Sequence, residues 1–101
     1  MKIKERLTQK IYPDKWEELE AVDKEFDAVE SGLGFPPKKR YRLILSSKSF
    51  NILVVEREWD SIADMEVAWE KLLVHPVLNA LSAQLNHVVE DSYTEILMPM
   101  P

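Results

Sequence analysis

Two polar residues interrupt the apolar phase of a strand pattern near the start of the chain. Residues 2–12 alternate between apolar and polar types with a period of two, which predicts a β-strand. Glu5 and Gln9 fall in the apolar phase, so both should lie on the face that the rest of the fold covers. A carboxylate held away from water has the surroundings of a general acid or base. We therefore take Glu5 as a candidate catalytic residue and Gln9 as a candidate ligand-binding residue.

Two arginines are candidates to act with Glu5. Arg57 falls in the same phase of a later predicted strand, and Arg42 lies on the strand before that one. In one interpretation, Glu5 exchanges a proton with a bound molecule while Arg57 or Arg42 orients an anionic group of that molecule. In the other, Glu5 and Arg57 form a buried ion pair with a structural role. The sequence does not choose between them.

Three tryptophans, Trp16, Trp59 and Trp69, fall on three different predicted elements that face one core. Aromatic residues at such positions are mostly packing residues, but two of them can also line an apolar pocket between helices and sheet. We therefore take Trp59 and Trp69 as candidate ligand-binding residues. Tyr93, on the last predicted strand, is a further candidate.

The two histidines are too far apart in the sequence to predict a shared metal site. His75 and His87 are separated by twelve residues, whereas helical metal pairs are three or four apart. His75 also precedes Pro76, which favours a role in ending a helix, although we retain it as a candidate ligand-binding residue. The absence of cysteine excludes thiolate metal sites and disulfides.

The composition predicts one ordinary globular domain over residues 1–101. The 46% of hydrophobic residues allow a core without disulfides, and two glycines are too few for a phosphate-binding loop. A net charge of −5 argues against nucleic acid or an anionic membrane as the partner. Because neither a secretory signal nor a long apolar run is present, we expect a cytoplasmic protein.

The element order predicts an α+β fold of the ferredoxin-like kind. We expect strands at 2–12 and 88–98, a hairpin over 38–59 with its turn at 46–49, a helix at 14–31, and a second helical region at 61–86 that is interrupted at 75–76. The resulting order β-α-β-β-α-β forms a four-stranded antiparallel sheet with both helices on one face. The eight acidic residues between 14 and 30 predict a solubilising outer helix face.

Strand phases predict which side chains the helices cover. The covered face should carry Ile3, Leu7, Ile11, Tyr41, Leu43, Leu45, Leu53, Val55 and Trp59. The open face should carry Lys4, Arg6, Thr8, Arg40, Arg42, Ile44, Ile52, Val54, Glu56 and Glu58, so that basic residues flank the acids of the third strand. Because Ile44, Ile52 and Val54 leave an apolar patch there, which Ile96 and Met98 could extend, we expect a homodimer through this face.

Three segments carry a resemblance to a known superfamily: residues 52–61 (ILVVEREWDS), Ala68-Trp69, and residues 75–80 (HPVLNA). They give an apolar strand ending in tryptophan, a capped helix, a helix break and a second short helix. In this respect the chain resembles the dimeric α/β-barrel superfamily, and within it the NIPSNAP-like and antibiotic-biosynthesis-monooxygenase-like proteins. The resemblance implies a homodimer whose sheets face each other as a barrel, and a helix–sheet cleft that often holds small aromatic or polyketide-like molecules.

The heme-degrading branch of this superfamily uses an asparagine on the first strand, with a tryptophan and a histidine in the second helical region. Here Trp69 matches the tryptophan, Glu5 stands where the asparagine is expected, and residues 79–82 supply no histidine. We therefore expect no cofactor. Two functions remain open: an enzyme of the cofactor-free monooxygenase or isomerase kind that acts on a small apolar molecule, and a non-catalytic dimeric module that binds a ligand or partner.

Overall fold

The computed structural model describes residues 1–44, 47 and 50–101 and contains one antiparallel sheet of four strands. The strands are β1 (Ile3–Ile11), β2 (Lys39–Arg42), β3 (Ile52–Trp59) and β4 (Val89–Leu97), in the spatial order β2-β3-β1-β4. Leu45 and three residues of the expected turn, Ser46, Lys48 and Ser49, lie outside the described residues. The predicted ferredoxin-like α+β fold is confirmed, although β2 is shorter than expected.

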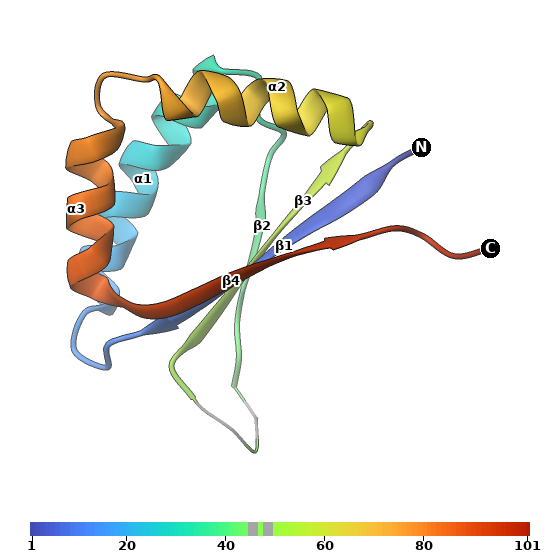
Figure 1. Cartoon of the computed structure of the whole chain (residues 1–101). Coiled ribbons are helices and arrows are strands. Elements are labelled where there is room, and N and C mark those ends of the chain that lie inside the picture. Colours follow the sequence, from blue (N-terminus) through green and yellow to red (C-terminus); the bar gives the residue numbers. More distant parts are fainter. Residues whose placement is uncertain (45–46, 48–49) are drawn as a thin grey trace.

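Three helices lie on one side of this sheet (Figure 1): α1 (Trp16–Gly32), α2 (Ile62–Leu73) and α3 (Leu78–Val88). Ser61 caps α2 by accepting a hydrogen bond from the backbone N–H of Asp64. The chain breaks between α2 and α3 at the expected His75-Pro76 pair. None of the helices in the described part of the chain is long and apolar enough to cross a membrane.

The predicted faces of β1 and β3 are confirmed by the strand register. Glu5 pairs with Arg57 and Leu7 with Val55 on the covered face, whereas Arg6 pairs with Glu56 on the open face. On the open face Arg6 and Lys4 both form ion pairs with Glu56, at 2.9 and 3.5 Å. The expected attraction between basic residues of the first strand and acids of the third is therefore present.

The predicted phase of β2 is wrong by one residue. Arg40 pairs with Val55 and Arg42 with Leu53, so both arginines lie on the covered face, and Tyr41 lies on the open face. The cause is α1, whose acids attract the basic residues of β2. Arg40 forms two hydrogen bonds with Glu20, which raise its own pKa and lower that of Glu20.

The acids of α1 are therefore more than a solubilising surface. Glu20, Asp23, Asp27 and Glu30 form ion pairs with basic residues on β2, on β3 and on the segment before β2. These contacts hold the helix against one edge of the sheet.

The register of β4 also changes the composition of the apolar patch that was expected on the open face. Ile96 pairs with Glu5, which places Ile96 on the covered side and removes it from the open face. Tyr93 pairs with Thr8 and therefore lies on the open face, where it is 57% exposed.

The core is divided into two clusters of buried residues. One surrounds Ile3 and contains Phe35, Trp59, Ala68 and Leu72. The other surrounds Ile11 and contains Leu19, Leu53, Val55 and Val88. On β1, the covered residues between these two ends are Glu5, Leu7 and Gln9. The two polar residues thus fall where neither cluster fills the space between sheet and helices.

Candidate functional site

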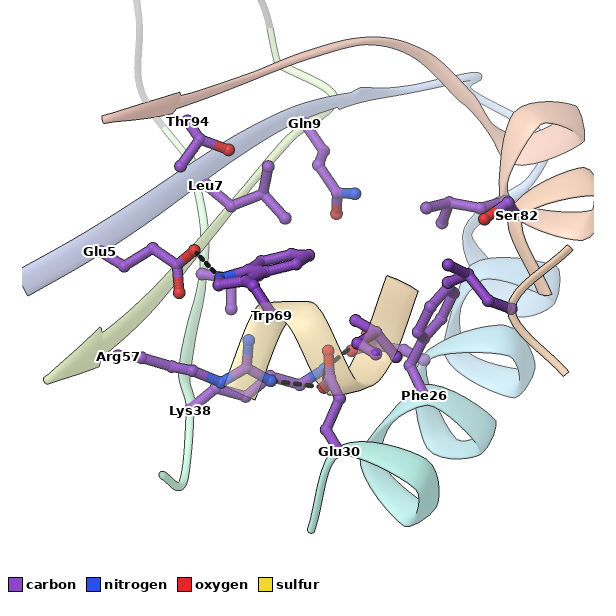
Figure 2. Close-up of a pocket in the computed structure, with 15 residues that line it drawn as sticks. Glu5, Leu7, Gln9, Phe26, Glu30, Lys38, Arg57, Trp69, Ser82 and Thr94 are labelled. Carbon is purple, nitrogen blue, oxygen red and sulfur yellow. Dashed lines mark hydrogen bonds and ion pairs between the residues drawn. The ribbon is translucent and has the colours of Figure 1, made fainter. Parts of the chain in front are cut away.

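A cavity of about 220 Å³ lies between the covered face of the sheet and the helices (Figure 2). Its walls are mostly apolar, and the lining residues are Glu5, Leu7, Gln9, Asp23, Phe26, Glu30, Lys38, Val55, Arg57, Trp69, Leu72, Leu78, Ser82, Leu85 and Thr94. An apolar cavity of about 150 Å³ holds benzene, whereas pockets for drug-sized ligands begin at about 300 Å³. This cavity therefore suits a molecule of one or two rings.

The carboxylate of Glu5 is held by two indole groups. Trp59 on β3 donates its indole N–H to Oε1 of Glu5, and Trp69 on α2 donates to Oε2, both at 3.1 Å. Phe35 packs edge-on against both indole rings, with centroid distances of 5.3 and 5.5 Å, and so fixes their positions. Each carboxylate oxygen accepts one neutral donor and keeps a second lone pair for another partner.

The structural interpretation in which Glu5 pairs with Arg57 is wrong. Although the two residues are register partners, Arg57 donates to Glu30 of α1 at 2.5 Å and to the backbone carbonyl of Pro36 at 3.2 Å. Arg57 also lies over the ring of Phe35. Glu30 therefore neutralises the charge of Arg57, and the donors that Glu5 receives from the described residues are both neutral.

Lys38 extends this ion-pair cluster along the cavity. Its ammonium group lies 2.7 Å from Asp23, 2.8 Å from Asp27 and 3.9 Å from Glu30, and its side chain is only 8% exposed. Burial raises the pKa of Glu30, and its attraction to Arg57 and Lys38 only partly offsets that effect. The two cations on the cavity wall are therefore matched by three carboxylates.

Four of the predicted site residues line the cavity: Glu5, Gln9, Arg57 and Trp69. Gln9 is buried, and Figure 2 shows its amide directed into the space beneath the sheet. Trp59 lies behind Glu5 and acts on the cavity through its hydrogen bond to that residue.

The other three predicted site residues lie elsewhere. Arg42 stacks on the ring of Trp16, 4.0 Å from its centroid, and is not placed to orient a molecule in the cavity. His75 accepts a hydrogen bond from the backbone N–H of Val77 and so shapes the break between α2 and α3. Tyr93 is on the opposite face of the sheet.

Several cavity residues were missed by the sequence analysis, among them Asp23, Glu30, Lys38, Ser82 and Thr94. A signal existed for two of them, since Asp23 and Glu30 are seven residues apart and therefore share one helix face. The hydroxyls of Ser82 and Thr94 carried no sequence signal. Among the described residues, no group of three or more His, Cys, Asp or Glu side chains is arranged to hold a metal ion.

The protein has an α+β fold in which three helices cover one face of a four-stranded sheet, with a mainly apolar cavity between them. No protein-family model and no curated protein sequence matches the chain. Solved structures do. The chain is similar to a NIPSNAP-like domain protein from Burkholderia xenovorans, with a TM-score of 0.83, 16% identity, and coverage of 98% of this chain and 85% of the other.

Two further structures have the same fold. A NIPSNAP family protein from Agrobacterium tumefaciens gives a TM-score of 0.77 at 21% identity, covering 99% of this chain and 94% of the other. SnoaB from Streptomyces nogalater, a cofactor-independent oxygenase, gives 0.71 at 15% identity, with the same two coverages. The expected likeness to NIPSNAP-like and monooxygenase-like proteins is thus confirmed as a shared fold.

Proposed function

We propose that this protein binds a small, mainly apolar organic molecule in the cavity and that Glu5 exchanges a proton with it. The observation that carries the proposal is the Glu5 carboxylate on the wall of an apolar cavity, fixed by two indole N–H donors and without a cationic partner among the described residues. A base must be both positioned and accessible, and this carboxylate keeps lone pairs for a ligand.

The chemistry follows from where the proton goes. A bound molecule with an acidic O–H or C–H bond directed at Glu5 loses that proton to a carboxylate oxygen. The bonding electron pair stays on the molecule as a phenolate or enolate. Such an anion either reacts with O₂ or takes the proton back at another carbon, which are oxygenase and isomerase outcomes. The shared fold with SnoaB supports the first.

A non-catalytic binding module is the second candidate. It is favoured by the ion pairs of Arg57 and Lys38 with the acids of α1, because these cations are already matched and leave no free charge to stabilise an anionic intermediate. In that case Glu5 anchors a hydrogen-bond donor of the ligand without taking its proton.

Binding of 2-naphthol, measured by isothermal titration calorimetry, tests the site. We expect binding to the wild type and at least tenfold weaker binding to Glu5→Gln, because a carboxylate accepts the phenol hydrogen more strongly than an amide does. The matched control is Glu56→Gln, which changes the same residue type on the open face and should leave the affinity unchanged. Absence of binding, or equal affinity for wild type and Glu5→Gln, would contradict the proposal.

We further propose that two copies associate through the open face of the sheet. A row of residues in register crosses all four strands on this face: Tyr41, Val54, Thr8 and Tyr93. Tyr41 is 51% exposed, and none of the helices in the described residues covers this side (Figure 1). An apolar row of this kind rarely remains in water, and a two-fold axis through it would stack the tyrosines of two copies.

Sedimentation equilibrium at micromolar concentration tests the dimer. We expect twice the chain mass of 11.8 kDa for the wild type and a single chain mass for Val54→Lys. The control Val67→Lys, on α2 and already half-exposed, should remain dimeric. A wild-type mass of one chain would refute the proposal.

A further inference from the structure

The polar groups of the cavity are divided between two ends. Glu5 and Gln9 are both on the floor formed by β1, with the apolar Leu7 between them. Four residues of strand place their Cα atoms about 13 Å apart. Figure 2 shows Glu5 at one end, beside Trp69, and Ser82 of α3 at the other end, with the Gln9 side chain between them and directed into the space beneath the sheet.

Gln9 is an amide without a partner. Gln9 is 6% exposed, and its side chain makes no hydrogen bond to another residue in the described part of the chain. Figure 2 accordingly draws no interaction between Gln9 and the other residues that line the cavity. Neither polar atom of Gln9 is among the fully buried atoms that lack a partner, so the amide borders the cavity with its donors and its acceptor unused. A bound molecule can therefore hydrogen-bond to it.

The charges on the wall favour an uncharged partner. Arg57 and Lys38 are paired with Glu30, Asp23 and Asp27, so this group of side chains carries no net positive charge that would attract a ligand carboxylate. Glu5 repels an anion at the opposite end. A neutral carbonyl or hydroxyl, in contrast, can accept from the Gln9 amide and from the hydroxyl of Ser82.

From this geometry we infer that Gln9, with Ser82, anchors a neutral carbonyl or hydroxyl group of the ligand, so that the site selects an uncharged two-ended molecule. Its acidic hydrogen faces Glu5, its apolar body lies over Leu7, and its second polar group reaches Gln9. The inference rests on the proposed function and specifies which small molecules the cavity takes. It makes Gln9 a positioning residue, because it fixes the ligand against Glu5 without touching the transferred proton.

Three naphthalene probes of the same width separate these features. The first is 2-naphthol, which has no second polar group. The second, 6-acetyl-2-naphthol, carries a neutral carbonyl at the far end, and the third, 6-hydroxy-2-naphthoate, carries an anionic carboxylate there. For the wild type, calorimetry should give at least tenfold tighter binding of the acetyl compound than of 2-naphthol. The naphthoate should bind no more tightly than 2-naphthol.

The Gln9→Leu variant should remove this preference and bring the two neutral probes within about twofold of each other. It should fold about as stably as the wild type, because the substitution removes no hydrogen bond between Gln9 and another residue of the described part of the chain. Ser82→Ala, at a half-buried position, is the second variant and should reduce the preference in part.

The outcomes distinguish this inference from the proposed function. If the two neutral probes bind the wild type equally, or if Gln9→Leu keeps the preference, the inference is overturned while the cavity remains a ligand site. Tighter binding of the naphthoate than of the acetyl compound would also overturn it. If no probe binds, the proposed function fails and the inference fails with it.

Discussion

Glu5 and Glu56 are on adjacent strands of one sheet but on opposite faces, and their surroundings differ in kind. Glu56 is paired with Arg6 and Lys4, and the hydrogen bond from Arg6 lowers its pKa. From the part of the chain that the structure describes, Glu5 receives hydrogen bonds only from neutral indole groups, and it borders a cavity. A carboxylate matched by cations stabilises the fold, whereas one held by neutral donors beside empty space is available to a ligand.

The space between the sheet and the helices contains both kinds of carboxylate. Glu30 is buried like Glu5, but Arg57 and Lys38 match its charge. Burial therefore does not by itself mark a functional residue. The two kinds of carboxylate differ in whether a cation or a neutral donor contacts them. Three sets of variants test this difference.

The largest effect is expected from breaking the Glu30–Arg57 pair. Removing one partner of a buried pair leaves an unmatched charge and costs about 3–5 kcal/mol. Arg57→Met should thus destabilise the protein strongly in urea unfolding. The double variant Glu30→Leu/Arg57→Met should recover most of that loss, because neither charge of the pair is then buried without the other, and Lys38 keeps its ion pairs with Asp23 and Asp27. Losses that simply add in the double variant would show that the pair is not coupled.

A smaller effect is expected at the tryptophan that links α2 to Glu5. Trp69→Phe keeps the aromatic contact with Phe35 and removes the N–H donor to Glu5. A hydrogen bond to a charged group is worth about 1.5–3 kcal/mol. The same substitution in a Glu5→Leu background should cost clearly less, because the acceptor is gone. Equal costs in the two backgrounds, measured by urea unfolding, would show that the indole acts only through packing.

The smallest effect concerns Glu56 on the open face. Because its pKa is lowered in the folded state, its ion pairs stabilise the protein above pH 4.5, and this stabilisation is lost as the pH falls below that value. Arg6→Gln should therefore cost up to about 1 kcal/mol at pH 7. At a fixed protein concentration, the difference from wild type should shrink progressively as the pH is lowered below 4.5. A difference that persists at low pH would mean that Arg6 acts through something other than Glu56.

The fold and the long strands could be predicted because their alternation is regular and one face is buried. The phase of β2 could not, because Lys39–Arg42 contains only amphipathic side chains that suit either face. The phase of β2 is set by the acidic residues of α1, which form ion pairs with Arg40, and such a tertiary contact is not visible in the local sequence.

The candidate site was predictable in its residues but not in its contacts. The phase of β1 placed Glu5 and Gln9 on the covered face, and Arg57 opposite Glu5. The strand phase could not predict that Arg57 would pair with Glu30 of α1, or that Glu5 would accept hydrogen bonds from tryptophans instead. The cavity depends on the spacing between the helices and the sheet, which no local pattern encodes.

The transfer of a proton to Glu5 is tested most directly by the fluorescence of 2-naphthol bound to excess protein. Neutral naphthol and its anion emit at different wavelengths, and the excited molecule is a strong acid that gives its proton to any base in contact with it. We predict emission from the anion in the wild type and in Glu56→Gln, and from the neutral form in Glu5→Gln. Neutral emission from the wild type, or identical emission from wild type and Glu5→Gln, would contradict the assignment of Glu5 as the base.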